Sequence, residues 1–325
     1  MSEVAFRQAV RDAIADEMEA DERVVLIGED VSQGGVFNVT PGLAERFGEL
    51  RVVDTPISEL AFTSAAFGAA VRGLRPVVEI MFGDFLALAL DSLGNQASKY
   101  WYLSNEQASV PLVVRSAVGA GASFGPCHSQ TPTGWFMGEP GLRLVAPSTP
   151  SDAYALTRAA IRDPNPVVVF EHKALYARKG ELNGASADLG RAVVRREGGH
   201  VTLCAAMAMV EVALEAAEAL ASEGIDAEVI DLRSLRPLDV ETVAASVRKT
   251  NHALLIEEGW PSFGVTAELA ARIQHVCFDF LDAPVERVGM AEVPLPYAKN
   301  LENAALPNVD RILAAAHSVL AGSRR

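Results

Sequence analysis

The chain has 325 residues, half of them hydrophobic, and carries a formal net charge of −14 with a sequence pI of about 4.9. This acidic balance argues against partners such as nucleic acids or anionic membrane surfaces, which require basic faces. No apolar run is long enough to cross a bilayer, the N-terminus lacks a signal-peptide pattern, and Cys127, Cys204 and Cys277 are too scattered for a zinc site or disulfide frame. A cytoplasmic protein of about two domains is expected.

The first part of the chain alternates strand and helix patterns. Helical spacing of apolar residues predicts a helix over residues 4–20, and a short apolar run predicts a buried strand over 24–28. A second apolar run, 50–53, ends in turn-forming residues, and a pattern of small residues then predicts a helix over 60–73. This order places Glu59 at the start of a helix and at the carboxyl end of a strand.

The same alternation continues to about residue 180. Further strands are predicted over 75–82, 111–115, 142–145 and 166–170, helices over 84–103 and 151–162, and a glycine-rich loop over 116–141. Such a β-α-β order is typical of a parallel sheet with helices on both faces. We therefore predict a doubly wound α/β domain over residues 1–180.

A polar stretch with several glycines, residues 181–197, has weak periodicity and is interpreted as a linker. A second β-α series follows, with strands over 201–206, 227–232, 253–256 and 285–288 and helices over 210–223, 239–249, 264–276 and 309–321. These elements predict a second, smaller doubly wound α/β domain over residues 198–325.

Two side chains stand out as candidate functional groups. Glu59 is either a helix N-terminal carboxylate that complements the helix dipole, with Ser58 as N-cap, or a ligand-binding group. The second interpretation follows from its place, because open α/β sheets bind ligands at the carboxyl ends of their strands. His128, inside the glycine-rich loop, is either a surface histidine or a group that moves protons near neutral pH. No nucleotide-binding glycine fingerprint, Walker sequence or nucleophile elbow is present.

Several short motifs occur in a fixed order along nearly the whole chain. They are Gly28-Glu29-Asp30-Val31, Asp54-Thr55-Pro56-Ile57-Ser58-Glu59, Glu79-Ile80 with Asp84-Phe85, His128-Ser129-Gln130, Pro140-Gly141-Leu142, Asp163-Pro164-Asn165-Pro166, and Glu228-Val229-Ile230-Asp231-Leu232-Arg233 with Pro237. The ordered set resembles the beta subunits of the thiamine-diphosphate-dependent 2-oxo acid dehydrogenases of the pyruvate, branched-chain and acetoin types. The resemblance implies a transketolase-like pyrimidine-binding domain followed by a transketolase C-terminal domain.

The resemblance also implies roles for single residues. Glu59 would bond to N1′ of the aminopyrimidine and favour the imino tautomer, through which the cofactor loses its C2 proton. Glu29 would lie near the cofactor, and Phe85 would stack on the pyrimidine. His128 would face the substrate, where it would place the carboxylate of the 2-oxo acid or move protons during acyl transfer. From the residues alone, the last three are equally compatible with ordinary capping, core and surface positions.

Metal ions and partners are implied in the same way. A structural K⁺ site is implied at Leu112, Ala160, Ile161, Asp163 and Asn165, although a plain helix C-terminus closed by a proline explains the same residues. An alpha subunit would complete an α2β2 heterotetramer and hold the diphosphate and Mg²⁺, because Gly83-Asp84-Phe85 lacks the second glycine of the Gly-Asp-Gly sequence. A 2-oxo acid is the implied substrate, and a lipoyl acyltransferase core is a further implied partner.

Two stretches depart from the family pattern and leave the outcome of the reaction open. Residues 103–107 replace a Ser-Gly-Gly-Gln-like turn, and within 131–139 Thr133 and Gly138 stand where the family has a glutamate and a second histidine. The leading hypothesis is a dehydrogenase subunit that transfers an acyl group to lipoyl. The alternatives are a decarboxylase or carboligase subunit without a lipoyl partner, and a non-catalytic assembly subunit, against which Glu59 argues.

Overall fold

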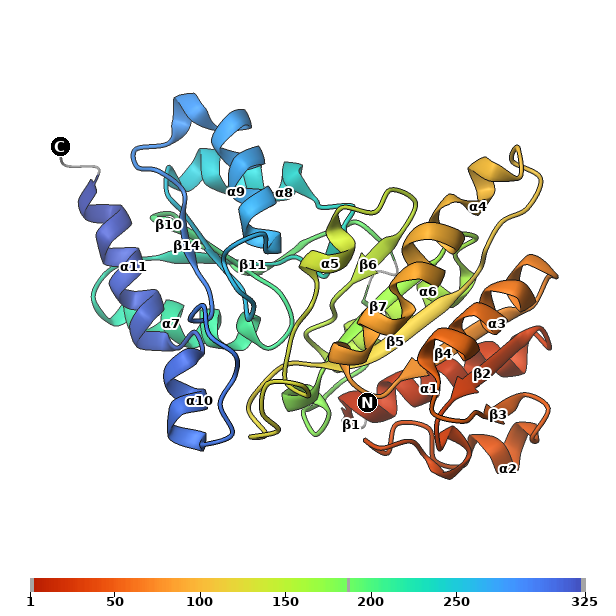
Figure 1. Cartoon of the computed structure of the whole chain (residues 1–325). Helices are drawn as coiled ribbons and strands as arrows, with labels where there is room; N and C mark the ends of the chain where they lie inside the picture. The colour runs from red at the N-terminus through yellow and green to blue at the C-terminus, as the bar shows by residue number, and fades with distance from the viewer. Residues whose placement is uncertain (1–2, 186–187, 323–325) are drawn as a thin grey trace. The chain divides into compact units, whose positions relative to one another are not determined.

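The computed structural model describes residues 3–185 and 188–322 and contains two compact units, both drawn in Figure 1. Unit 1 spans Met1–Gly119 and Cys127–Leu189, and unit 2 spans Ala120–Pro126 and Gly190–Arg325. A short piece of the predicted glycine-rich loop therefore belongs to unit 2. Within the described residues, no helix combines the length and the apolar character that crossing a bilayer requires.

Unit 1 is built on parallel strands that follow one another in the order β6-β7-β5-β4-β2-β3. Their bounds are β2 (Val24–Gly28), β3 (Val52–Asp54), β4 (Arg75–Ile80), β5 (Val113–Val118), β6 (Arg143–Val145) and β7 (Val167–His172). Strands β5 and β7 are buried along their whole length, as expected of a parallel sheet that helices cover on both faces. The predicted parallel sheet is confirmed.

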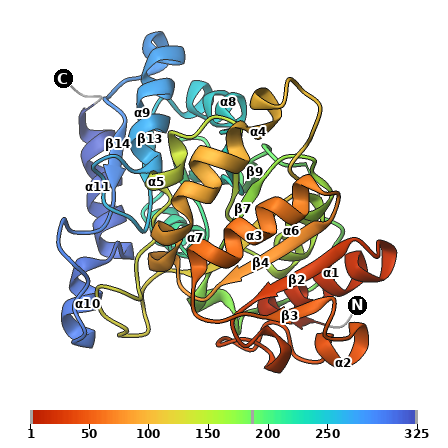
Figure 2. The same cartoon turned by 45° about the vertical axis from the view of Figure 1, so that its right-hand side comes forward.

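Helices cover this sheet, and Figure 2 shows α3 in front of β4 and β2. Helix α1 packs against α6, whereas α3 packs against η2 and η3. The helical segments of unit 1 are α1 (Phe6–Ala20), η1 (Val31–Gln33), α2 (Leu43–Phe47), α3 (Glu59–Val71), η2 (Gly83–Ala89), η3 (Asp91–Ala97), α4 (Ser98–Leu103), α5 (Gly134–Met137), α6 (Pro150–Arg162) and η4 (Lys173–Leu175). A two-stranded antiparallel pair joins β1 (Val4–Ala5) to β8 (Lys179–Gly180).

Two details of unit 1 differ from the sequence prediction. Instead of one helix over 84–103, the chain forms a 3₁₀ segment, a π segment and a short α-helix. The carbonyl of Gly94 accepts a hydrogen bond from Ser98 Oγ at 2.7 Å and another from Lys99 Nζ, and such side-chain bonds compete with a regular helical ladder. Leu50, predicted within a buried strand, is 92% exposed because the strand begins only at Val52.

Unit 2 has a smaller sheet with the strand order β14-β13-β10-β11-β9. The strands are β9 (Val193–Arg196), β10 (Val201–Ala205), β11 (Ala227–Asp231), β13 (Ala253–Ile256) and β14 (Glu286–Val288), and a further short strand is β12 (Ser234–Arg236). Strand β9 lies inside the predicted linker and pairs antiparallel with β11. Its arginines, which gave the stretch its polar character, form ion pairs with Asp231 and Asp226.

The helices of unit 2 are α7 (Met209–Ser222), α8 (Val240–Thr250), α9 (Val265–Val276), η5 (Phe278–Phe280), α10 (Lys299–Ala305) and α11 (Val309–Gly322). Helices α7 and α11 pack against each other, and α8 packs against α9. Alanines and leucines of α7 and α11 meet the apolar side chains of β10, β11 and β13 in one buried cluster. This cluster is the core of unit 2 and confirms the predicted second α/β series.

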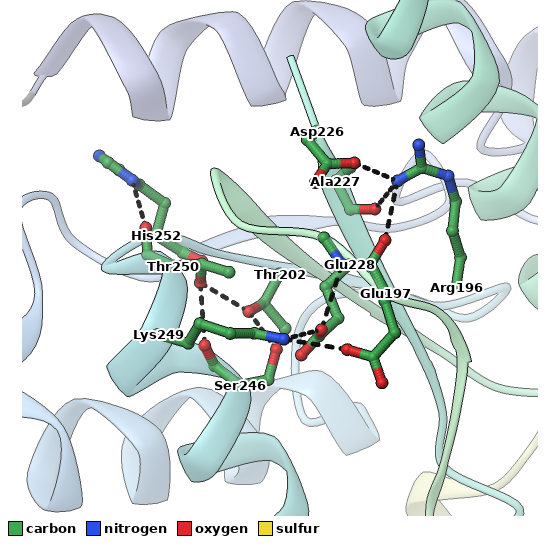
Figure 3. Close-up of polar contacts among 11 residues, drawn as sticks. Arg196, Glu197, Thr202, Asp226, Ala227, Glu228, Ser246, Lys249, Thr250 and His252 are labelled. Carbon is green, nitrogen blue, oxygen red and sulfur yellow. Dashed lines mark hydrogen bonds and ion pairs between the residues drawn. The ribbon is translucent and has the colours of Figure 1, made fainter.

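A polar network joins α8 to β10 and β11 (Figure 3). Lys249 contacts the buried carboxylate of Glu228 and lies 3.1 Å from that of Glu197. The Thr202 hydroxyl is 2.6 Å from that of Ser246 and 2.7 Å from that of Thr250. These contacts satisfy the buried polar groups of Glu228, Thr202, Ser246 and Thr250, whereas Lys249 and Glu197 are exposed.

The loop segment that belongs to unit 2 is held by a fully buried carboxylate. Glu302 accepts hydrogen bonds from the backbone N–H groups of Gly121 at 3.0 Å and Ser123 at 3.1 Å. Lys299 Nζ lies 3.2 Å from the same carboxylate and donates to the carbonyl of Gly121 at 2.6 Å. Although burial opposes it, these bonds hold the pKa of Glu302 below its usual range.

The free energy of unfolding of the Glu302→Gln variant is therefore expected to be about 1–3 kcal/mol lower than that of the wild type at pH 7. Because the folded-state pKa is lowered, this stabilisation is complete above the unfolded-state pKa of about 4.3 and is lost as the pH falls through the folded-state pKa. Urea unfolding from pH 7 down to pH 3 measures both effects. The control is Glu268→Gln, a change of an exposed side chain on α9. A stability difference between Glu302→Gln and wild type that stays constant across this pH range would contradict the assignment.

Candidate active site

Three buried carboxylates gather at the carboxyl ends of β2 and β4. Glu29 follows β2, Glu59 begins α3, and Glu79 lies in β4 opposite the last residue of β2; each is at most 5% exposed. Burial raises the pKa of Glu29, and the negative charges of Glu59, Asp30 and Glu79 raise it further. The family resemblance implied separately that Glu29 and Glu59 lie at the cofactor, and the structure places the two carboxylates close enough for their charges to interact.

The turn before Glu59 is tied to the end of β2 and to η1. The carboxylate of Asp54 accepts from the backbone N–H of Ser32 at 2.8 Å and from its hydroxyl, and the N–H of Thr55 donates to the carbonyl of Gly28 at 3.0 Å. These bonds place the first turn of α3 at the strand ends. Ser58 occupies the predicted N-cap position, but its side chain makes no capping hydrogen bond.

Several polar groups of this site have no hydrogen-bond partner in the part of the chain that the structure describes. Across the described ranges 3–185 and 188–322, no group donates a hydrogen bond to the Glu59 carboxylate, and Oε1 of Glu29 and Oγ1 of Thr55 are buried without a partner. Buried polar atoms in folded proteins are nearly always hydrogen-bonded, so a bound molecule with N–H or O–H groups would complete this site. A carboxylate that served only the helix dipole would gain nothing from such burial.

A buried ionic layer adjoins these carboxylates. Arg115 of β5, 2% exposed, forms two bonds with Glu171 of β7, at 2.7 and 2.6 Å, and a third with Glu79 of β4. The Tyr176 hydroxyl donates to Glu171 at 3.0 Å. Burial alone would lower the pKa of Arg115, but the negative charges of Glu171 and Glu79 raise it. Burial raises the pKa of Tyr176, and the negative charge of Glu171 raises it further.

Sequence analysis missed this layer. Its only signal is that Glu79, Arg115 and Glu171 interrupt the apolar runs of the strands 75–80, 113–118 and 167–172. Gly35 leaves room for the carboxylate of Glu79, because a side chain at position 35 would overlap that carboxylate. Its φ of +68° also suits glycine.

Phe85 and His128, which are predicted from separate motifs, lie side by side. Their ring centroids are 5.4 Å apart, and the ring of Phe82 lies 4.7 Å from that of His128 and 5.6 Å from that of Phe85. All three rings are half-buried and meet edge to face. Because η2, which carries Phe85, packs against α3, this aromatic cluster belongs to the same strand-end region as Glu59.

Asp84, at the start of the helix predicted over 84–103, does not cap it. Its Oδ2 atom accepts from the backbone N–H of Gln130 at 3.4 Å, and its Oδ1 atom is buried without a partner. The helical segment starts one residue earlier, at Gly83, and has no side-chain cap. Asp84 instead contacts the loop that carries His128.

The predicted K⁺ residues lie around the C-terminus of α6. Ala160 and Ile161 are in its last turn, and the carboxylate of Asp163 accepts from the backbone and side-chain N–H groups of Asn165, both at 2.8 Å. Leu112 precedes β5, and its carbonyl accepts a hydrogen bond at 2.9 Å.

The cations that these oxygens contact in the structure are arginines. Arg75 donates to the carbonyl of Ile161 at 2.6 Å, and Arg143 lies 3.0 Å from the carboxylate of Asp163. A carbonyl oxygen has two lone pairs, so these bonds leave room for a further donor or cation. The K⁺ site stays a prediction. In the part of the chain that the structure describes, no three His, Cys, Asp or Glu side chains are placed to hold a metal.

The comparisons with known proteins cover both units. The model of the transketolase pyrimidine-binding domain matches residues 2–179, and that of the transketolase C-terminal domain matches residues 190–312. A solved structure described as a split-gene transketolase, inactive beta4 tetramer, has a TM-score of 0.82 and 24% identity, with 99% of each chain covered. This likeness agrees with the predicted two-domain α/β fold.

Similar curated proteins from a plant, an animal and a bacterium are named as beta subunits of the pyruvate dehydrogenase E1 component. The mitochondrial pyruvate dehydrogenase E1 component subunit beta-1 of Arabidopsis thaliana is 47% identical over 96% of this chain and 88% of its own length. The mitochondrial beta subunit of Bos taurus is 45% identical over 98% and 91%, and the beta subunit of Rhizobium meliloti is 43% identical over 98% and 70%. The chain therefore belongs to the E1 beta-subunit family of the 2-oxo acid dehydrogenases, as its ordered motifs predicted.

Proposed function

We propose that this chain, together with an alpha subunit, forms a thiamine-diphosphate-dependent 2-oxo acid dehydrogenase that decarboxylates pyruvate and passes the acyl group to a lipoyl domain. The observation that carries the proposal is the buried Glu59 carboxylate, which has no donor among the described residues. The three curated relatives described above are each named as a pyruvate dehydrogenase subunit, which supports pyruvate as the substrate.

The donor-poor oxygens of the site fit the aminopyrimidine of the cofactor. An aminopyrimidine has N–H groups, whereas among the described residues nothing donates to Glu59, a residue only 5% exposed, or to the buried Oε1 of Glu29. When bound, thiamine diphosphate supplies the carbanion chemistry of the decarboxylation. Glu59 would accept a hydrogen bond at the ring nitrogen, and the low exposure of the residue, 5%, would strengthen this bond. Burial, and after it the negative charge of Glu59, raise the pKa of Glu29.

The aromatic cluster fits the substrate side of the same site. Phe85 is half-buried and would offer an apolar surface to the pyrimidine. His128 lies against this ring on the loop that follows β5, where its imidazole can place the substrate carboxylate or move a proton during acyl transfer. The diphosphate and Mg²⁺ fall to the alpha subunit, since this chain has Gly83-Asp84-Phe85 in place of Gly-Asp-Gly.

A second candidate is a decarboxylase or carboligase that has no lipoyl partner. It is favoured by the departures from the family pattern that follow His128 by a few residues. Thr133 is buried directly before α5, and Gly138 directly follows that helix. Both positions therefore lack the ionisable side chains that the family pattern has there.

Turnover of the co-purified α–β complex distinguishes the two candidates. Release of CO₂ from pyruvate, from a branched-chain 2-oxo acid and from 2-oxobutyrate is measured with Mg²⁺, thiamine diphosphate and a lipoyl domain, and acylation of that domain is followed by mass spectrometry. We expect the highest kcat/KM with pyruvate, and acylation that keeps pace with CO₂ release. CO₂ release without acylation would favour the decarboxylase or carboligase, and a preference for the branched-chain acid would refute pyruvate as the substrate.

A further inference from the structure

Lys173 is a buried lysine that the proposed mechanism does not use. It directly follows β7 and is only 9% exposed, although lysine is rarely so deeply buried. Its ammonium group donates to the backbone carbonyl of His128 at 2.9 Å. The same ammonium group lies 5.5 Å from the ring centroid of Phe82, a distance at which a cation is attracted to an aromatic face.

The residue before Lys173 contacts the start of the same loop. The imidazole of His172 fills the space beside Gly119, where any side chain would overlap it, and the φ of Gly119 is +94°. The backbone N–H of Gly119 donates to the carbonyl of Gln130 at 3.2 Å and closes the base of the loop. Two adjacent residues at the end of β7 therefore contact both ends of the loop that carries His128.

We propose that Lys173 is a positioning residue for His128. Its ammonium group fixes the His128 backbone through a charged hydrogen bond and holds the ring of Phe82, against which the His128 imidazole packs. One side chain thus sets both the backbone and the ring environment of His128. The inference rests on the proposed function of His128 at the substrate side.

Turnover of the α–β complex with substitutions at Lys173 gives the first test. Lys173→Met keeps the length of the side chain but removes the charge and the donor, and it is expected to lower kcat/KM for pyruvate by about 10-fold, since small misplacements of catalytic groups cost this much or more. Lys173→Arg keeps a cation and a donor and should recover most of the loss. Lys179→Met, a change of an exposed lysine in β8, is the control and should behave as wild type.

A double-mutant cycle with His128→Ala separates positioning from a general structural role. If Lys173 acts through His128, Lys173→Met causes no further loss of kcat/KM in the His128→Ala background. The affinity for thiamine diphosphate, measured by fluorescence quenching, should be the same in all variants. Lys173→Gln takes the place of Lys173→Met if the latter fails to assemble with the alpha subunit.

Two results would overturn the inference and leave the proposed function standing. One is wild-type kcat/KM in Lys173→Met, and the other is an equal loss with and without the His128 imidazole. A different result, in which His128→Ala alone retains full activity, would refute the proposed role of His128 and with it the role of Lys173.

Discussion

Replacement of Glu59 by glutamine is expected to lower turnover of the α–β complex by about 10²-fold or more. Glutamine keeps the size of the side chain but replaces the anionic acceptor with a neutral amide. The carboxylate is buried at the strand ends without a donor among the described residues, so a bond to a bound ring nitrogen is what it can supply. Release of CO₂ from pyruvate at saturating thiamine diphosphate measures the loss.

The matched control for this experiment is Glu45→Gln. Glu45 also lies in the first turn of a helix, α2, but it is exposed, so it has only the helix dipole to complement. We expect Glu45→Gln to retain full turnover. If Glu59→Gln likewise retained full turnover, Glu59 would be no more than a helix-terminal carboxylate, and the non-catalytic assembly hypothesis would gain its first support.

Replacement of Arg115 by methionine is expected to lower the free energy of unfolding by about 3–5 kcal/mol. Arg115 is the shared partner of Glu79 and Glu171, which are 4% and 0% exposed, and its loss leaves two buried carboxylates without their cation. A loss of this size is a large share of the roughly 5–15 kcal/mol that stabilises a typical domain. Urea unfolding followed by circular dichroism measures it.

Two comparisons test the cause of that loss. Arg46→Met removes an exposed ion pair with Glu19 and should cost at most about 1 kcal/mol. Neutralising the whole layer, by Arg115→Met together with Glu79→Gln and Glu171→Gln, should recover part of the lost stability, because no buried charge is then left unpaired. An Arg115→Met protein as stable as Arg46→Met would show that the buried pairs contribute no more than surface ones.

Much of the fold follows from short-range patterns. The apolar runs 24–28 and 201–206 and the helical spacing over 4–20 and 210–223 each depend on neighbours within a few residues, so they predict strands and helices close to those observed. Their β-α-β order then predicts parallel sheets. The position of Glu59 also follows locally, because a strand, a turn and a helix succeed one another around it.

Two elements of the structure, strand β9 and the divided helical segment over 84–103, were not predicted from the sequence pattern. Strand β9 has two arginines among its four residues, and their charges are matched by Asp231 and Asp226, which come from elsewhere in unit 2. The helix predicted over 84–103 is divided because side chains bond to the carbonyl of Gly94. In the first case the partners are distant in sequence, and in the second they are side chains four and five residues away whose bonds the apolar spacing does not report.

The sequence by itself determined the order of the elements, the family and the place of Glu59, because these depend on local spacing and on ordered motifs. Only the tertiary structure decided which charges meet. Arg115 joins Glu79 and Glu171 because β4, β5 and β7 lie next to one another in the sheet, and Lys173 reaches the carbonyl of His128 from 45 positions away. Such contacts depend on sheet order and loop closure, which bring distant residues together and leave no periodic trace in the chain.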